Sequence, residues 1–584
     1  MDQSPSPRED QQKAICKPSQ GSIRRHRSAL APILSLPTEI ITAIFFLLRE
    51  PPATAATYHE EEEKLDHLAW LNVAHVCHQW RETALNQPLF WSHVNFASFS
   101  SAGVTEILDR AKNVPLHLEA RLPSSWDAAR FSAFTKELQT RISHICYLGF
   151  TAGYPHLQKT LEKLVSPAPT LEYLSLRRGA FRARGSSISV PDSLFDGTAP
   201  RLSFLELRHC DISWKSPLLK SVTYLEIRYP SANARPSLSI WLDVLEEMPQ
   251  LKTLTLYSAS PIAPAGLRLS SYIERTITLP SLEDFDISAS ARECGLALAH
   301  LVLPALTHLG VMADQWHPEI SESASDVQDV IQYLSRYTHG PQDTQPLRSV
   351  YICNTSTIVI VAWTLLDINI ELPNDICFLE PMPSARVAFC VPYMERFSGS
   401  HAGLFDAAMA TLPLDNIVTL TTYKFSEFDE QFWLRYAPRW PLLRHVCLGP
   451  PAAYGFTAML LEENGCPLLP LLTKIVLGKT RLGEYRTLRL CDTFIKRVEQ
   501  GVPLETLDLR TCLTTSRAVE LLSEIVIEVL PPEDVLATKA DVVSHKTLPG
   551  GHFIPDVGGN DEAWGDWEFD ANKYKYVIHW DREY

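Results

Sequence analysis

The sequence predicts an α/β solenoid that follows a small all-α module near the N-terminus. The first observation behind this prediction is a recurring Leu-x-x-Leu-x-Leu pattern, which fills 96–530. The second is a pair of blocks, 34–48 and 70–91, in which apolar residues recur at steps of three and four. The sequence contains no phosphate-binding Gly-rich loop, no His-Glu-x-x-His and no Gly-x-Ser-x-Gly. We therefore expect a protein that acts by binding and is not an enzyme.

Composition narrows the class of protein further. The chain has 584 residues, which is too long for one small domain, and its net charge is −15. That charge argues against a nucleic-acid partner, because such proteins gain affinity by neutralising phosphates with a basic face. The most apolar run, 357–366, is too short to cross a bilayer, so we expect no membrane partner. The twelve cysteines are scattered without a Cys-x-x-Cys pair, which is typical of a cytoplasmic or nuclear protein.

Residues 1–32 are rich in Pro, Ser and Gln and show no periodicity, so they predict a disordered tail without a signal peptide. The tail contains the basic cluster Arg24-Arg25-His26-Arg27-Ser28. A nuclear signal and a kinase site at Ser28 are both open interpretations. Because short basic clusters are common by chance, a plain solvated tail is favoured.

The first helical block begins at Pro37, where the missing N–H of proline would have no partner in any case. Its apolar residues form one face that is widened on one side: Leu36, Ile40, Ile44 and Leu48, with Ile41 and Phe45 beside them. Pro51-Pro52 ends the helix. The acidic run Glu60–Glu63 then predicts an exposed insertion over 50–66.

The second block has one helical face made of Trp70, Val73, Cys77, Trp80 and Ala84. A bend near Cys77–His78 could divide this block without destroying the face. His75, Cys77 and His78 converge poorly on a helix, so no metal is expected. Pro88 closes the block and Trp91 follows it.

Taken in order, these segments resemble an F-box. The family pattern combines Leu-Pro-x-Glu plus two apolar positions, a Val-Cys-x-x-Trp-Arg core and a final Pro-x-x-Trp. The corresponding segments here are 36–41, 76–81 and 88–91. The resemblance covers 33–95, and it departs from the family pattern through the insertion at 50–66.

The resemblance implies a non-catalytic substrate-recognition subunit of a Skp–cullin–F-box ubiquitin ligase, which serves ubiquitin-dependent protein degradation without a cofactor. The F-box would bind a Skp-type adaptor and, through it, a cullin. By motif position, the apolar adaptor contacts would be Leu36, Pro37, Ile40, Ile41, Ile44, Val76, Cys77, Trp80, Leu89 and Trp91. Glu39 and Arg81 would be polar contacts at the rim.

The repeat copies in 96–530 are degenerate. Clear copies start at Leu171, Leu202, Val222, Leu251, Leu282, Leu306, Leu347, Leu442 and Leu504. Weaker copies lie near 142–148, 385–390, 415–420 and 472–477, and successive starts are mostly 20 to 41 residues apart. This is a loose version of the leucine-rich repeat, with Cys210 and Cys512 at the position that takes Asn or Cys.

Each copy predicts a short strand with inward apolar side chains, and segments such as 241–248, 327–337 and 491–500 predict outer helices. The units stack because none can close its own core. The positions between the leucines point away from the core, and aromatic and acidic residues there suit a protein-binding face. The candidates for contacting a target protein are Tyr173, Phe204, Glu206, Tyr224 and Glu226.

The repeat is lost at 531–584, where the last 21 residues are rich in aromatic side chains. We expect this tail to cap the last repeat, because solenoid ends need cover. A peptide-like partner motif is the alternative. For the whole chain, the alternative function is a leucine-rich-repeat interaction scaffold outside any ubiquitin ligase, with the F-box-like helices as its N-terminal cap.

Overall fold

The computed structural model describes most of the chain between residues 32 and 532. The described residues are 32–49, 69–96, 98–122, 126, 128–179, 187–263, 275–313, 324–337, 346–354, 357–365, 385–392, 401–423, 430–461, 467–532, 547–548 and 552–553. The predicted tail, the acidic insertion at 50–66 and the aromatic residues of the C-terminal tail lie outside these ranges. The chain divides into two compact units, 1–179 with 190–202 and 180–189 with 203–584.

Unit 1 opens with the helical module predicted over 33–95. Its elements are η1 (Pro32–Ser35), α2 (Thr38–Arg49), η2 (Ala69–Asn72), α3 (Val73–Val76), α4 (His78–Leu85) and η3 (Pro88–Trp91). The carbonyl of Pro37 accepts the N–H groups of Ile40 and Ile41, so α2 starts beside this proline as expected. The module therefore consists of two short helical blocks.

The rest of unit 1 is a parallel sheet with helical crossovers. Its strands pair in chain order: β1 (His93–Asn95), β2 (Leu116–Leu122), β3 (Ile145–Ala152) and β4 (Tyr173–Arg178). The helices between them are α5 (Ser101–Ala111), α6 (Ala128–Arg141) and α7 (Tyr154–Leu161). The sheet begins two residues after the helical module ends, so module and first repeat are directly joined.

Unit 2 continues the alternation of strands and helices. Its main sheet, in order of pairing, contains β6 (Phe204–Arg208), β8 (Tyr224–Arg228), β9 (Thr253–Tyr257), β11 (Asp284–Ala289), β13 (His308–Ala313), β16 (Val387–Pro392), β15 (Thr357–Trp363), β14 (Ser349–Asn354), β17 (Thr419–Tyr423), β18 (His445–Leu448), β19 (Lys474–Leu477), β20 (Thr506–Asp508) and β21 (Glu528–Leu530). All neighbouring pairs are parallel except the two that involve β15.

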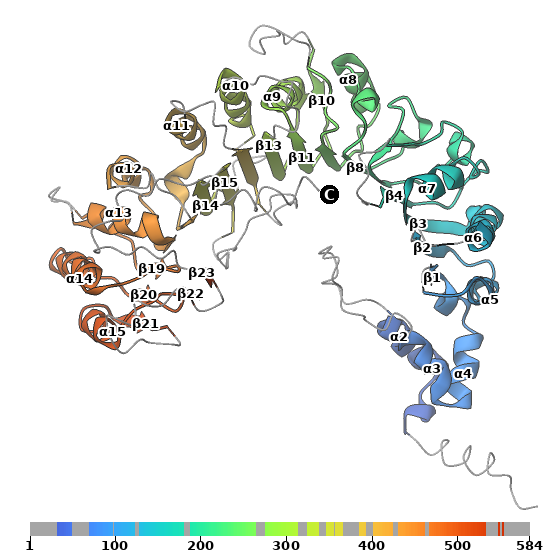
Figure 1. Ribbon diagram of the computed structural model, residues 1–584, viewed down its shortest axis with the longest axis horizontal. Coiled ribbons are helices and arrows are strands. Elements are labelled where there is room, and N and C mark those ends of the chain that lie inside the picture. The colour runs from blue at the N-terminus through green and yellow to red at the C-terminus, as the bar shows by residue number, and fades with distance from the viewer. Residues whose placement is uncertain are drawn as a thin grey trace, which may run out of the picture. The chain divides into compact units, whose positions relative to one another are not determined.

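The helices of unit 2 lie along one side of this sheet (Figure 1). They are α8 (Leu238–Glu246), α9 (Ala291–His300), α10 (Ala324–Leu334), α11 (His401–Thr411), α12 (Glu430–Tyr436), α13 (Pro450–Leu460), α14 (Glu484–Glu499) and α15 (Ser516–Ser523). We call the opposite side of each strand the helix-free face. The chain thus has an α/β solenoid-like fold, which confirms the predicted fold class.

The repeat leucines form the core. Leu251, Leu254 and Leu256 are completely buried, and the corresponding apolar residues of the other clear copies are buried too, with one exception. In the copy assigned to Leu442 the buried residues are Leu443, Val446 and Leu448, so the predicted register is wrong by one position. The doublet Leu442-Leu443 caused the error, because side chains alternate along a strand and a one-residue shift exchanges the two faces.

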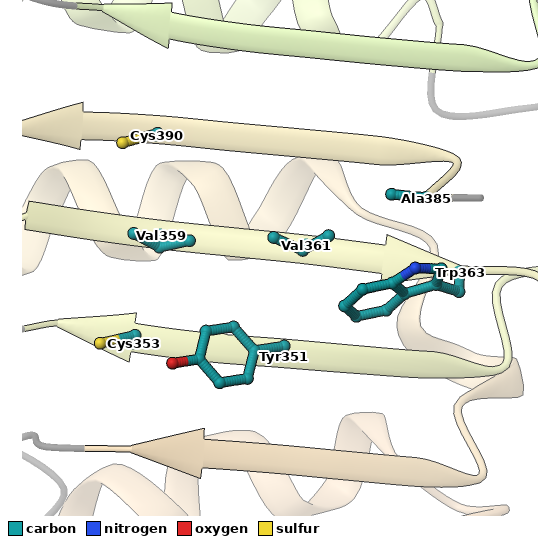
Figure 2. Close-up of a cluster of buried hydrophobic side chains, with 7 residues drawn as sticks. All are labelled: Tyr351, Cys353, Val359, Val361, Trp363, Ala385 and Cys390. Atoms are coloured by element: carbon teal, nitrogen blue, oxygen red, sulfur yellow. The ribbon is translucent and has the colours of Figure 1, made fainter. Parts of the chain in front are cut away.

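The antiparallel strand β15 interrupts the repeat between β14 and β16. Its neighbours β14 and β16 would otherwise continue the parallel order, so β15 is an inserted strand that the repeat pattern did not predict. The helix-free face of these three strands carries a buried apolar cluster, to which Ala385 just before β16 also belongs: Tyr351, Cys353, Val359, Val361, Trp363, Ala385 and Cys390 (Figure 2). Within the apolar run at 357–366, residues 358–363 of β15 are therefore buried on both faces of the sheet, whereas Leu365 is exposed.

Candidate protein-binding surfaces

Aromatic rings form the core of the helical module. The ring of Phe45 contacts the rings of Trp80 and Phe90 at centroid distances of 5.2 and 5.6 Å. Trp91 donates its indole N–H to the carbonyl of Ala84 at 2.7 Å. Ile41, Trp80 and Trp91 are all buried, so these three predicted adaptor contacts lie inside the module and support its surface from within.

Cys77 forms the bend that was predicted in the second block. It is extended, with φ −157° and ψ 173°, between the last residue of α3 and the first of α4. Its Sγ accepts the backbone N–H of Trp80 at 3.4 Å, which caps α4. The Arg81 side chain donates to the carbonyl of Ala74 at 2.8 Å and joins the two helices. Both residues therefore fix the angle between α3 and α4.

The outside of the module is apolar. Ile40, Val76 and Leu89 are exposed, as are Pro37 and Glu39, whereas Leu36 and Ile44 are half-buried. Four further exposed apolar residues were not among the predicted contacts. We define the module surface as the exposed set Ile33, Ile40, Leu47, Leu48, Val76, Leu85 and Leu89. An exposed apolar set of this extent on a small helical module is typical of a protein-interaction site.

A known family model covers this same region. It is described as F-box-like, and it matches residues 33–97. The chain carries an F-box-like domain. The match starts at the predicted boundary and ends two residues beyond the predicted one. Comparison with curated proteins gives no match for the chain.

Neither membrane nor metal chemistry has support in the described residues. None of the described helices combines the length and the apolarity that crossing a membrane requires. Within the same ranges, His, Cys, Asp and Glu side chains form no group of three or more that could hold a metal ion.

In unit 2 the helix-free face brings four of the five predicted target-binding residues together. Phe204 and Tyr224 are neighbours in register on β6 and β8, and their rings stack at 3.9 Å with an angle of 11°. Glu206 and Glu226 are the next neighbours on the same face. These two aromatic and two acidic residues form the β6–β8 patch.

A polar network orders the β6–β8 patch. The Tyr224 hydroxyl donates to Oε2 of Glu226 at 2.7 Å, and Arg228 donates to Oε1 of the same carboxylate at 2.6 Å. Burial and the negative charge of Glu226 raise the pKa of Tyr224, so its hydroxyl keeps its proton and remains a donor. The side chains are thus held in place before any partner binds.

Sequence reasoning missed an acidic continuation of this face on β11 and β13. His308 lies between the carbonyl of Ala385, at 2.5 Å from Nδ1, and the carboxylate of Asp286, at 3.1 Å from Nε2. Both partners are hydrogen-bond acceptors, so this arrangement favours an imidazole with a proton on each ring nitrogen, which is the charged form. Burial lowers the pKa of His308, but the hydrogen bond and charge of Asp286 outweigh this and raise it overall.

Gly310 makes the contact between Asp286 and His308 possible. It faces Asp286 across the β11–β13 pair, and a Cβ at this glycine would lie 1.9 Å from Oδ1 of Asp286. Any larger residue would therefore displace the carboxylate from His308. The repeat copies that start at Leu282 and Leu306 place these residues between the buried apolar positions, so the sequence signalled the shared face but not the close contact of Asp286 with His308.

The fifth predicted target-binding residue, Tyr173, belongs to a separate row of rings in unit 1. Its ring stacks on that of Tyr147 with a centroid distance of 4.0 Å. The ring centroids of Tyr147 and His117 are 3.6 Å apart, and those of His117 and His93 are 4.4 Å apart. The four residues occupy one register position on β1 to β4. His93, His117 and Tyr147 have the same position relative to the buried apolar residues of their strands as Tyr173. The sequence pattern could therefore have identified them.

Proposed function

We propose that this chain is the substrate-recognition subunit of a Skp–cullin–F-box ubiquitin ligase. The F-box-like domain at 33–97 carries the proposal, and its exposed apolar surface supports it. In this role Ile40, Val76 and Leu89 contact the adaptor directly, with Pro37, Leu36 and Ile44 beside them. Glu39 and Arg81 lie exposed at the rim and contribute polar contacts.

The solenoid-like part then holds a target protein. Its contribution to ubiquitin transfer is geometric, because it keeps a lysine of the target close to the charged conjugating enzyme that the cullin brings. The β6–β8 patch supports this role, since the half-buried rings of Phe204 and Tyr224 provide contact area, while Glu206 and Glu226 beside them are buried and Glu226 orients Tyr224. Tyr173 and the ring row of unit 1 form a second candidate contact. The complex acts in the cytoplasm or the nucleus.

Co-purification with a Skp-type adaptor tests the proposal. Val76 is 60% exposed in the module surface, whereas Val302, in β12 (Leu301–Val302) outside the module, is 45% exposed. We expect Val76→Asp to weaken adaptor binding by roughly tenfold or more, because a charge would have to be buried in an apolar interface. The matched control Val302→Asp should bind like the unchanged chain. Equal binding by both variants, or no binding by the unchanged chain, contradicts the ligase proposal.

A specific contact favours one alternative, a repeat scaffold with an N-terminal cap. The guanidinium of Arg110 in α5 lies over the ring of Trp91, 4.6 Å from its centroid, and joins the helical module to the first repeat. A cap needs such a contact but needs no adaptor. If the unchanged chain fails to bind the adaptor, yet its module stays protected from proteolysis, the scaffold function is supported instead.

A further inference from the structure

Helix α14 carries an unusual outward surface. Tyr485, Leu488, Ile495 and Val498 are between 44% and 59% exposed, and we call these four residues the α14 stripe. The opposite face of the helix is buried, with Leu490 and Phe494 in the core. Among the described residues of helices α5 to α13 and α15, Tyr154 is the only other large apolar side chain with such exposure. Outward positions of a helix are normally polar, so the α14 stripe is a candidate contact site.

The size of the α14 stripe indicates what kind of occupant fits. Stable interfaces between separate proteins take about 800 Å² from each partner, which four half-exposed side chains on one helix do not supply. A segment of the same chain needs far less contact area, because its tether holds it at an effective concentration in the millimolar range. The α14 stripe therefore suits an intramolecular occupant better than a second molecule.

The last residues of this chain have the matching chemistry. The stretch 554–584 follows Phe553 and holds seven aromatic side chains in its final part: Trp564, Trp567, Phe569, Tyr574, Tyr576, Trp580 and Tyr584. In Trp567-Glu568-Phe569 and Tyr574-Lys575-Tyr576 aromatic and charged residues alternate. An extended segment of this kind presents its rings on one side and its charges on the other, because successive side chains of an extended chain point in opposite directions.

Chain length and position allow this contact. The helix α14 has 16 residues and is therefore about 24 Å long, while 31 extended residues reach about 100 Å. In the fold, α14 packs against α15, and α15 packs against β21, the last strand along the chain that pairs in the main sheet. The terminal segment follows β23 (His552–Phe553), which comes after β21 along the chain.

We propose that residues 554–584 bind across the α14 stripe, with the aromatic side of the segment against the four apolar side chains. This contact covers the outward face of the penultimate helix, and it does not require the ligase function proposed above. It also makes the α14 stripe unavailable to other proteins while the terminal segment is bound.

Photo-crosslinking in the full chain tests the proposal. A benzoylphenylalanine in place of Leu488 should crosslink to peptides from 554–584, identified by mass spectrometry. The same group in place of Arg489, which is exposed but lies beside the α14 stripe, is the matched control and should give several-fold less of this product. Crosslinks from position 488 to another segment, to another protein, or to nothing overturn the proposal.

Two further measurements distinguish binding of the terminal segment to the α14 stripe from binding of a second copy of the chain. The yield of the crosslink should stay constant on roughly tenfold dilution, because an intramolecular contact does not depend on concentration. A yield that falls on dilution overturns the proposal in favour of a dimer. Replacing both Trp567 and Phe569 by Ser should remove most of the crosslink and leave the fold intact. An unchanged crosslink in that variant also overturns the proposal.

Discussion

The buried ion pair between Arg235 and Glu293 shows how single residues hold neighbouring repeats together. Both side chains are at most 5% exposed, and Arg235 also donates to the carbonyl of Ser260 at 3.0 Å. Glu293 additionally forms a capping box with Ser290 at the start of α9. The pair joins the loop before α8 to the start of α9. Each side chain neutralises the charge of the other, and neither charge has access to water.

We expect Glu293→Ala to lower the free energy of unfolding by about 3–5 kcal/mol, because it leaves the Arg235 charge buried without its partner. The matched control is Glu283→Ala, since Glu283 pairs with Lys252 at 4.0 Å with both side chains more than half exposed. Removing this exposed pair should change the free energy of unfolding by less than about 1 kcal/mol. Urea unfolding measures both variants, and equal effects would contradict the assignment.

His308 predicts a pH dependence of stability. Its pKa in the folded chain lies above the unfolded value of about 6.5, so charged His308 stabilises the fold. This contribution is fully present below the unfolded pKa and is lost as the pH rises through the folded pKa. Asp286 and Asp284 face the ring from β11, and the carbonyl of Ala385 faces it from the start of β16.

The test compares urea unfolding of the unchanged chain and His308→Gln over a pH range that starts below the unfolded pKa of about 6.5 and ends above the folded pKa of His308. The difference in stability should be largest at the acid end and shrink towards the alkaline end. Gly310→Ala should produce a similar loss, since the added Cβ displaces the Asp286 carboxylate. A stability difference that is independent of pH would show that His308 is held neutral.

Among the elements, α2 best illustrates why the site needed the structure. Ile40 is 48% exposed and Ile41 is fully buried, although they are adjacent and both apolar. The face predicted from Leu36, Ile40, Ile44 and Leu48 turns out to be the outer one, while Ile41 and Phe45 form the core. Apolar residues surround most of this helix, so periodicity alone could not decide which side would be buried.

This arrangement separates binding from stability in two neighbouring residues. We expect Ile41→Ala to lower the free energy of unfolding by about 2–5 kcal/mol, because it leaves a cavity beside the aromatic core. In contrast, Ile40→Ala should leave stability nearly unchanged and weaken adaptor binding. Calorimetry together with adaptor titration measures the two effects. The assignment is wrong if Ile40→Ala destabilises the module more than Ile41→Ala.

At the level of the whole molecule, the helical module belongs to the same compact unit as β1 to β4. Val94 and Phe96 are buried, and β1 pairs with β2 along its edge. The first repeat is therefore completed by residues that the family match assigns to the F-box-like domain.

We predict that a chain starting at residue 98 aggregates or unfolds at a lower temperature than the full chain, because a repeat array needs its first core covered. A chain starting at residue 32 is the control and should behave like the full chain. Thermal unfolding and size-exclusion chromatography measure both. A stable and soluble 98–584 chain would contradict the direct joining of module and repeats.

The architecture could be predicted from the sequence because buried apolar residues alternate with outward-facing residues along the strand of each repeat. Leu174 and Leu176, or Leu254 and Leu256, lie two residues apart and face the same side of a strand wherever that strand pairs. The inserted strand β15 escaped prediction because it is buried on both faces and shows no alternation. The doublet Leu442-Leu443 misled the register for a related reason, since both residues are apolar and only packing distinguishes them.

The sequence by itself determined the order of the parts, the F-box-like pattern and most of the buried residues. Tertiary structure decided which apolar face of α2 is free, and it placed Ile41, Trp80 and Trp91, which the resemblance implies as adaptor contacts, in the core. It also decided which polar residues become neighbours, such as Asp286 and His308, which are 22 positions apart. Local periodicity reports whether a side chain is apolar, whereas its exposure and its partners depend on the strands and helices that pack beside it.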